Sequence, residues 1–370
     1  MRTYRIFVIN PGSTSTKLSL HENDRMVFST DVFHDSSVLR QFGNINNQLD
    51  YRMQVIDEFL KEEGLDLTGI DAIVGRGGGC YSLPGGIYDI DDQMIMDTRN
   101  CAGNLYHSSN LGVQMARRLW EKYGGRLFTV NPPVVDELQD VARITGVKGV
   151  YRKAICHALN LKAVAHKYCA ENGLDYDHSN LIVCHIDGGI SLTAHHNGRM
   201  IDGNDAGGGQ GPFTPTRMGS MAVTDVINEL KGCSYEEIKS LCAQSGGLSS
   251  HFGTSNSDKI HAMVENGDEY ASLIWEAMTY QVCKGIGSLA CVLSGKVDAI
   301  VLTGGLLRFD DIVDQIRERC GWIAPIALYP GEYEHESMAH EALRVLQGEI
   351  SSLKYPGRPV FEGFDYEVLR

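Results

Sequence analysis

The sequence contains an internal echo that limits the folds open to it. Residues 5–26, RIFVINPGSTSTKLSLHENDRM, resemble residues 181–200, LIVCHIDGGISLTAHHNGRM. In each segment an apolar strand ends at Asn10 or Asp187, and a glycine, Gly12 or Gly189, follows two residues later. A second alternating strand, a tight polar turn and a methionine complete each segment. This order of strands and polar turns is typical of β-hairpins.

A second pair of segments repeats the pattern in the same order. DAIVGRGGG at 71–79 resembles DAIVLTGGL at 298–306, and both are short apolar strands that end in a glycine turn. The second half has the longer stretch between its two segments, and we expect the loop-rich residues 203–260 to account for it. Self-similarity at half the chain length predicts two related α/β domains.

The length of 370 residues also fits two domains. Helical apolar periodicity falls between the strands, as at 51–64 and in a long run that stops at Gly295. We expect a first domain over 1–150, a linker near 145–153 and a second domain over 151–336. A C-terminal helix within about 337–370 is expected to pack back on the first domain.

Composition excludes several classes of function. The formal net charge of -14 argues against nucleic acid or an anionic membrane as partner. A small anionic substrate would need local cations. No apolar run approaches the ~20 residues of a membrane span, and the start MRTYRIFVINPG does not resemble a signal peptide. The ten cysteines include no CxxC pair, so we expect reduced, mostly buried thiols in a cytoplasmic protein.

The glycine turns suit phosphate binding. Small residues let the backbone approach an anion, while N–H groups and hydroxyls donate hydrogen bonds. Taken singly, each turn is more often a plain tight turn. Two matching turns together with two matching strand–Gly-Gly ends favour a nucleotide cleft between duplicated domains. The chain has no GxxxxGK[ST] P-loop and no strand–GxGxxG–helix unit of the Rossmann type.

Several motifs carry a more specific resemblance. VINPGSTSTK, CHALN (156–160), CHIDGGIS (184–191), GPFTPTRMGS (211–220) and LTGG (302–305) together resemble the butyrate kinase family. That family belongs with the acetate kinases in the actin, Hsp70 and sugar-kinase superfamily. The similarity spans the chain, and GPFTPTR is specific to short-chain fatty acid kinases. It implies a duplicated ribonuclease H-like (actin-like ATPase) α/β fold with an interdomain nucleotide cleft and adenosine-binding insertions in the second domain.

The resemblance also implies a reaction. ATP and a carboxylate would give an acyl phosphate and ADP, reversibly, with Mg²⁺ as cofactor and a homodimer or higher homo-oligomer as the assembly. Butyrate is the first candidate acid, with acetate, propionate and branched short-chain acids as alternatives, because one methylene changes binding by only ~1–3 kcal/mol. A nucleotide-binding switch on the same fold, or a catalytically weak relative, remains a different reading.

An ionised carboxylate needs no general base, but it needs cations to approach a polyanion. By resemblance, Arg76 and Arg217 are those cations, at the substrate and the transferring phosphoryl group. His185 resembles the histidine that stabilises this group, and His107 resembles a substrate-side histidine. Surface arginines and packed histidines are the structural alternatives.

The resemblance assigns the phosphates and the metal to the glycine turns and to one glutamate. Contacts to phosphates and the metal shell fall to Asn10, Gly12, Ser13, Ser15 and Lys17. In the second half, Asp187, Gly188 and Gly189 would hold the β-phosphate, and Gly304 and Gly305 would face the adenosine. Glu334 would share the metal with Asn10, with Glu336 as the adjacent alternative.

One position departs from the family pattern. The family usually has an aspartate where this chain has Asn131, in the segment FTVNPPVVDEL. An amide neither takes a proton nor binds Mg²⁺ with a full charge. Asp136, five residues on, is a possible substitute or a structural cap. Because an ionised substrate needs no base, we expect Asn131→Asp to keep or raise turnover.

Overall fold

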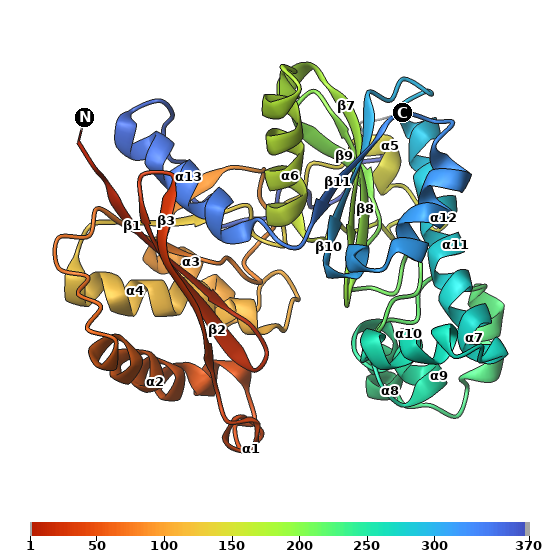
Figure 1. The fold of residues 1–370 in the computed structure, drawn as a ribbon, viewed down its shortest axis with the longest axis horizontal. Coiled ribbons are helices and arrows are strands. Elements are labelled where there is room, and N and C mark those ends of the chain that lie inside the picture. Colours follow the sequence, from red (N-terminus) through yellow and green to blue (C-terminus); the bar gives the residue numbers. More distant parts are fainter. Residues whose placement is uncertain (1, 367–370) are drawn as a thin grey trace. The chain divides into compact units, whose positions relative to one another are not determined.

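The computed structural model describes residues 2–366 and separates into two compact units. Unit 1 comprises Met1–Asp136 and Tyr333–Arg370, and unit 2 comprises Glu137–Glu332. Each unit has its own β-sheet with helices packed against it (Figure 1). The chain therefore leaves the first unit once and returns to it for its C-terminal segment.

Unit 1 contains a six-stranded mixed sheet in the order β3-β2-β1-β4-β6-β5. β1 lies inside the sheet, antiparallel to β2 and parallel to β4, and its apolar run from Ile6 to Ile9 is fully buried. An uninterrupted apolar run of this kind is what a central strand covered on both faces requires. The strands are β1 (Arg5–Pro11), β2 (Ser15–Glu22), β3 (Arg25–Phe33), β4 (Ala72–Gly75), β5 (Ile87–Asp89) and β6 (Arg126–Val130).

Helices cover this sheet with residues from both ends of the chain. α4 contacts β1, β4 and β6, and the C-terminal helix α13 contacts the same three strands. The last helix is thus part of the hydrophobic core of unit 1. The helices are α1 (Ser36–Leu39), α2 (Leu49–Glu62), α3 (Asp92–Arg99), α4 (Gly112–Tyr123) and α13 (Glu334–Gln347), with 3-10 helices η1 (Ile45–Gln48) and η2 (Ser108–Leu111).

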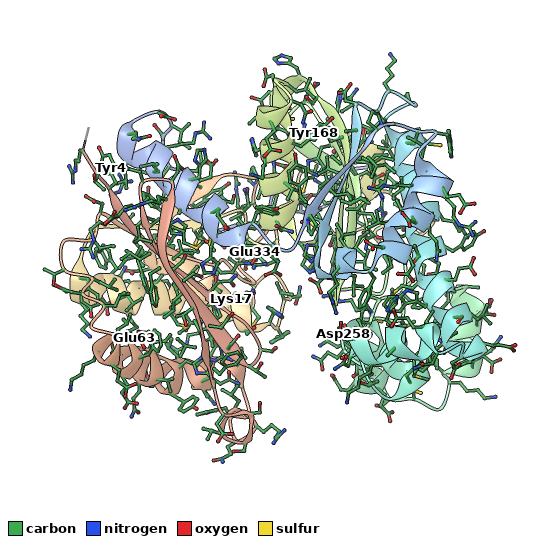
Figure 2. All side chains as sticks on the ribbon, in the orientation of Figure 1. Tyr4, Lys17, Glu63, Tyr168, Asp258 and Glu334 are labelled. Atoms are coloured by element: carbon green, nitrogen blue, oxygen red, sulfur yellow. The ribbon has the colours of Figure 1, made fainter. Side chains whose placement is uncertain are left out.

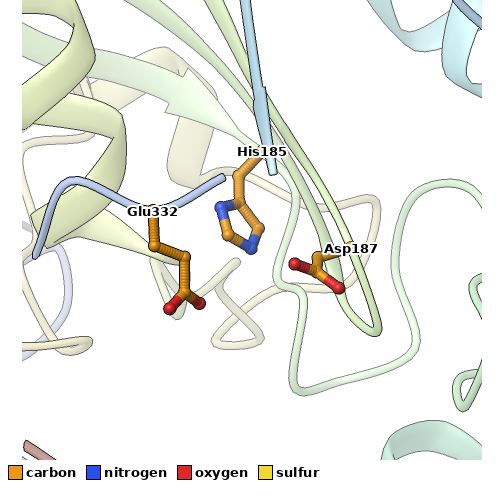
Figure 3. Close-up of side chains that lie close together, drawn as sticks. All are labelled: His185, Asp187 and Glu332. Atoms are coloured by element: carbon orange, nitrogen blue, oxygen red, sulfur yellow. The ribbon is translucent and has the colours of Figure 1, made fainter. Parts of the chain in front are cut away.

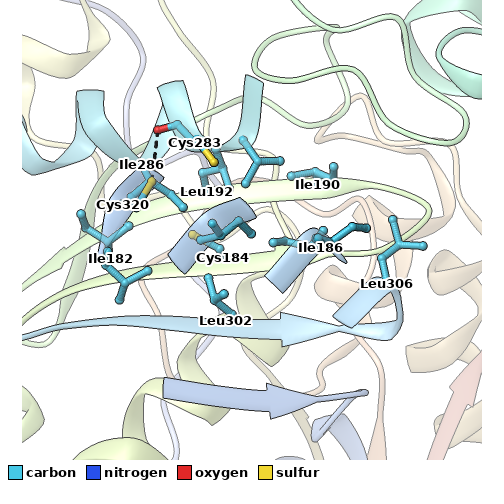
Figure 4. Close-up of a cluster of buried hydrophobic side chains, with 14 of the residues drawn as sticks. Ile182, Cys184, Ile186, Ile190, Leu192, Cys283, Ile286, Leu302, Leu306 and Cys320 are labelled. Carbon is cyan, nitrogen blue, oxygen red and sulfur yellow. Dashed lines mark hydrogen bonds between the residues drawn. The ribbon is translucent and has the colours of Figure 1, made fainter. Parts of the chain in front are cut away.

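Unit 2 contains a five-stranded sheet in the order β11-β10-β7-β8-β9. β7 pairs antiparallel with β8 and parallel with β10, as β1 does with β2 and β4. Side chains of the unit 2 strands β7, β8, β9 and β10 form a buried core with α11 and α12 (Figure 4). The strands are β7 (Asn180–Ile186), β8 (Ile190–His196), β9 (Arg199–Gly203), β10 (Ala299–Gly304) and β11 (Ile326–Pro330).

The main helices of unit 2 lie before and after these strands. None of the helices within residues 2–366 is long and apolar enough to cross a membrane. Unit 2 contains the α-helices α5 (Asp140–Arg143), α6 (Ala158–Glu171), α11 (Glu269–Val292) and α12 (Asp310–Cys320), and the 3-10 helices η3 (Tyr176–His178) and η4 (Gly305–Arg308).

The stretch at 203–260 contains long loops, as expected, but also helices that the sequence did not predict. This stretch holds three short helices and the start of a fourth: α7 (Val223–Glu229), α8 (Tyr235–Ala243), α9 (Leu248–Phe252) and α10 (Ser257–Glu265). Local caps start two of them, a capping box of Ser234 with Glu237 and the side chain of Asn256. Neither α7 nor α8 buries a residue.

Unit 2 begins at Glu137, earlier than the residue 151 expected from the sequence. The segment before 151 is bound to the edge strand β9. The Gln139 N–H donates to the Ile201 carbonyl at 2.9 Å, and a carboxylate oxygen of Glu137 accepts from the Met200 N–H at 2.8 Å. These hydrogen bonds make residues 137–150 part of the second sheet's surroundings. Unit 1 correspondingly resumes at Tyr333, before the expected residue 337.

The two units share the detailed geometry of their first three strands. In unit 1, Ser19 Oγ lies 2.9 Å from His21 Nε2, and in unit 2, Thr193 Oγ1 lies 2.9 Å from His195 Nε2. Both histidines are fully buried, and each follows a register shift in its hairpin. The internal duplication predicted from the sequence is therefore confirmed at the level of single side chains.

The turn after the second strand is also shared. Asn23 and Asn197 both adopt left-handed backbone geometry, with φ of 54° and 49°. Asparagine tolerates this conformation better than most residues, so both hairpins use the same residue for the same turn. The two units differ at the other end of the hairpin, where the glycine turns lie.

Candidate active site

A buried arginine forms hydrogen bonds to the backbone of the first glycine turn. Arg52 on α2 is fully buried, and its guanidinium donates to the carbonyls of Gly12 (2.9 Å), Ser13 (2.8 Å) and Ser15 (3.2 Å). Burial lowers the pKa of Arg52 to about 10, which keeps it charged at neutral pH. Arg52 thus binds three carbonyls of the turn, while the Gly12 N–H donates to the Ser15 carbonyl at 2.8 Å within the turn.

Sequence reasoning missed Arg52. The available signal was its position four residues before Ile56 and eight before Leu60, on the buried face of α2. A cation on an apolar helix face needs hydrogen-bond acceptors nearby, and a turn with several carbonyls supplies them.

Three residues predicted from the sequence meet in one buried cluster of unit 1. Glu334, labelled in Figure 2, lies in the first turn of α13. One of its carboxylate oxygens accepts a hydrogen bond from Asn10 Nδ2 at 2.8 Å and also pairs with Arg76 Nη1. Glu334 is only 4% exposed. Lys17 is exposed on β2, and its backbone lies opposite Asn10 in the sheet register. The cluster therefore joins β1, the end of β4 and α13.

Close packing fixes the loop that carries Arg76. A Cβ added to Gly78 would lie 2.4 Å from Asn110 Oδ1, and this oxygen accepts from the Gly79 N–H at 2.8 Å. His107 precedes this asparagine at the N-terminus of η2, where its exposed ring accepts from the Ser109 N–H at 3.2 Å. The same short helix thus bears His107 and orders the arginine loop.

Asn131 has a structural partner. It is buried with φ of 38°, its Oδ1 accepts from the Gly86 N–H at 2.7 Å, and its own N–H donates to the Gly86 carbonyl at 3.0 Å. Asp136 is also buried, and its N–H donates to the Leu83 carbonyl at 2.9 Å. A carboxylate at position 131 can accept the same hydrogen bond as the amide.

In unit 2, the side chain of Asp187 connects the two glycine segments predicted to bind nucleotide. One carboxylate oxygen accepts from the Gly188 N–H at 2.8 Å and the other from the Gly305 N–H at 2.8 Å. Gly304 has φ of 107°, and a Cβ there would lie 2.3 Å from the Ile186 carbonyl oxygen. Only glycine fits at this point, which brings the ends of β7 and β10 together.

The GPFTPTR segment clasps the second glycine turn. The hydroxyls of Thr214 and Thr216 donate to the Gly188 carbonyl at 2.7 and 3.0 Å. The guanidinium of Arg217 lies so close to Gly189 that a Cβ there would be 2.4 Å from Nη1. The turn is therefore held by two hydroxyls on one side and faces a cation on the other.

Arg217 has donors without acceptors. Among residues 2–366, no partner is found for its buried Nε and Nη1 atoms. Burial lowers its pKa, an effect that Asp205 opposes, yet a guanidinium remains charged in proteins. Burial likewise raises the pKa of Asp205. Because a buried unsatisfied donor costs about 1–3 kcal/mol, this arginine indicates a site for an anion.

His185 is the last residue but one of β7 and is 2% exposed. Its ring stacks on His157 with centroids 4.0 Å apart. Figure 3 shows the ring facing the carboxylates of Asp187 and Glu332, and potential ligand atoms of the three residues lie within 4.8 Å of one another. Carboxylates and an imidazole at this spacing are able to bind a cation or to accept and donate hydrogen bonds around a phosphate.

Glu332 was not among the residues selected from the sequence. It follows β11 by two residues, and the parallel partners β10 and β7 end at Gly304 and near His185. Because the carboxyl ends of parallel strands meet at one edge of a sheet, its position after the strand was the available signal.

Comparison with known proteins gives a family match over part of the chain. Residues 147–318 match the acetokinase family. This range contains His185, Asp187, Arg217 and the Gly304–Gly305 pair, whereas the cluster around Glu334 lies outside it.

Solved structures extend the likeness to the whole chain. The acetate kinase of Porphyromonas gingivalis is 19% identical with a TM-score of 0.71, over 93% of this chain and 100% of that one. The acetate kinase of Entamoeba histolytica is 17% identical with a TM-score of 0.73, over 93% of this chain and 100% of that one. A propionate kinase from Francisella tularensis subsp. tularensis SCHU S4 is 18% identical with a TM-score of 0.71, over 91% of this chain and 98% of that one. The predicted two-domain α/β fold is thereby confirmed as the fold of these solved kinases.

Proposed function

We propose that this chain is a short-chain carboxylate kinase, which transfers a phosphoryl group between ATP and a carboxylate to form an acyl phosphate and ADP. The observation that carries the proposal is Arg217, whose guanidinium lies against Gly189 and whose buried Nε and Nη1 have no acceptor among residues 2–366. It lies within the range that matches the acetokinase family. The resemblance of the fold to acetate and propionate kinases supports the same reaction class.

The charges present suit an anionic nucleophile. A carboxylate is ionised at neutral pH and needs no base, so the barrier is lowered by positioning and by neutralising charge. In the proposal, Arg217 neutralises the transferring phosphoryl group and Arg76 the substrate side. His185 donates a hydrogen bond to the transferring group.

The glycine turns hold the nucleotide in this proposal. The Asp187–Gly189 turn would bind the β-phosphate, with Gly304 and Gly305 toward the adenosine. In unit 1, the hydroxyls of Ser13 and Ser15 and the ammonium of Lys17 would contact the outer phosphates. The hydrogen bonds of Arg52 to the carbonyls of that turn support this role, because they occupy acceptors of the turn.

The residues of unit 1 fit Mg²⁺. A carboxylate from Glu334 and an amide oxygen from Asn10 are hard oxygen ligands, and Mg²⁺ is usually held by one or two carboxylates together with phosphate oxygens and waters. Arg76 and Asn10 both contact the same oxygen of this carboxylate. When bound, the ion would neutralise part of the charge of the triphosphate.

Within this class we propose butyrate as the preferred acid, on the strength of the sequence motifs; acetate and propionate are the alternatives that the structural neighbours favour. The test traps acyl phosphate with hydroxylamine from purified protein, Mg-ATP and acetate, propionate, butyrate, isobutyrate or valerate in turn. A maximum at butyrate supports the finer proposal, and a maximum at acetate or propionate corrects it.

Two results of the same assay contradict the reaction class. One is the absence of product with every acid from folded protein that binds ATP. The other is release of ADP at a rate independent of carboxylate, which indicates a nucleotide switch. Light scattering on the same preparation tests the homo-oligomer that the resemblance implies.

A further inference from the structure

The hydrogen bonds behind His185 run in one direction. The hydroxyl of Thr303 donates its only proton to the Gly331 carbonyl at 3.0 Å, so its oxygen accepts from Asn160 Nδ2 at 3.1 Å. The same Nδ2 lies 3.0 Å from His185 Nδ1. An amide NH₂ has two protons, one for each neighbour. Thr303 and Asn160 are fully buried and His185 is nearly so, which shields these hydrogen bonds from water.

We propose that Asn160 is a positioning residue that holds neutral His185 as the tautomer with the proton on Nε2. Nδ1 is the acceptor in this arrangement, so Nε2–H is a donor. Figure 3 shows the ring nitrogen farther from the backbone directed toward the space beside Asp187 and Glu332. The stacked ring of His157 keeps the imidazole in this plane. The consequence for catalysis rests on the proposed function; the tautomer itself does not.

This assignment decides how the three side chains in Figure 3 act. A histidine binds a metal through an unprotonated nitrogen, and Nε2 carries a proton here. Both oxygens of Asp187 already accept backbone N–H groups. The group made by His185, Asp187 and Glu332 is thus arranged to present an N–H to a phosphoryl oxygen rather than to bind a cation.

The tautomer can be measured directly. In protein labelled with ¹⁵N-histidine, long-range ¹H–¹⁵N correlation spectra distinguish the two tautomers and the imidazolium, and the spectrum of His185→Gln identifies the signals of His185. We expect an unprotonated Nδ1 and a protonated Nε2 at neutral pH. A protonated Nδ1, in either the other tautomer or the imidazolium, overturns the inference.

Variants connect the tautomer to the reaction. An aspartate at position 160 only accepts hydrogen bonds, so Asn160→Asp should move a proton to Nδ1 and lower kcat roughly 100-fold, while KM for the carboxylate changes less than about threefold. Thr303→Ser keeps the hydroxyl and is the matched control, with the tautomer and kcat of the unaltered protein. An unchanged tautomer in Asn160→Asp contradicts the proposal.

A second variant covers failure of Asn160→Asp to fold. Thr303→Val removes the acceptor that orients the amide, so the His185 signals should show a mixture of tautomers, and a single unaltered tautomer would contradict the inference. If the chain phosphorylates no carboxylate, the proposed function fails, while the spectra still decide the tautomer.

Discussion

The two glycine turns of this chain use arginine in opposite ways. In unit 1, Arg52 lies under the turn and binds its carbonyls, so its hydrogen-bonding capacity is consumed by the protein. In unit 2, Arg217 lies against Gly189 with two buried N–H groups that have no acceptor within residues 2–366. The first arginine builds its turn, whereas the second is available to a ligand. Similar hairpins thus have arginines with different hydrogen-bond partners beside their turns.

The largest expected effect tests the available arginine. Arg217→Ala should lower kcat for acyl phosphate formation roughly 100- to 1,000-fold, because it removes a charged donor aimed at the transferring group. The thermal midpoint should stay the same or rise, since the cost of an unsatisfied buried guanidinium disappears. Arg217→Lys, which keeps the charge but not the fork, should recover part of the rate. Full activity in the alanine variant would break the comparison.

The next effect tests the consumed arginine. Arg52→Met keeps the apolar part of the side chain but leaves several turn carbonyls without donors, and should lower the free energy of unfolding by about 3 kcal/mol or more. Urea unfolding measures this, with Arg217→Met as the matched control at which stability is retained. Equal stability losses in both variants would show that the two arginines do not differ in role.

The buried histidine of the shared hydroxyl–histidine pair predicts how the stability of the protein changes at acidic pH. Burial lowers the pKa of His21 to about 4, against an ordinary value of 6.5. Above pH 6.5 both folded and unfolded chains are neutral at this site, so stability is complete. As the pH falls from 6.5 to 4, the unfolded chain takes up the proton first and stability declines. His34 is shifted in the same direction, also by burial.

Urea midpoints measured between pH 7 and 4.5 test this expectation. His21→Gln should show a shallower loss of stability with falling pH than the unaltered chain. His196→Gln, at an exposed position, is the control and should keep the original slope. Because burial also lowers the pKa of His195, the corresponding His195→Gln in unit 2 should behave like His21→Gln. A slope unaffected by either buried substitution would contradict the prediction.

The smallest effect is expected at Asn131. Asn131→Asp retains an acceptor for the Gly86 N–H and should keep or raise turnover. Asn131→Leu removes the acceptor and should cost about 1–3 kcal/mol of stability. Steady-state kinetics together with urea unfolding separate the two outcomes. A large fall in turnover in the aspartate variant would show that the amide itself is required.

Local patterns predicted the fold better than they predicted the site. The hairpins were visible because strand alternation and turn residues are properties of adjacent residues, and β1–β3 and β7–β9 formed as expected. The short helices α7 and α8, which bury no residue, were not predicted. The residues of the candidate site were chosen by resemblance, and their contacts depend on residues far apart, as in the bonds of Asn10 and Arg76 to Glu334.

Two missed residues show the limits of reading charge from a sequence. Arg52 lies on the apolar face of α2, but nothing local marks the carbonyls that it binds, which lie 37 to 40 positions earlier. Glu332 follows an edge strand whose pairing with β10 is a long-range property. In both cases the side chain acquires its role only when distant backbone is brought beside it.

The matching hairpins record the history of the chain. A register shift before a buried histidine, a hydroxyl bonded to that histidine and a left-handed asparagine at the turn recur together in both units. Independent origin would have to produce all three twice, so descent from one ancestral half by gene duplication is the simpler account. Duplication also released each copy from the demands of the other. In unit 1 an arginine, Arg52, then came to bind the turn, whereas in unit 2 Arg217 kept donors for a ligand.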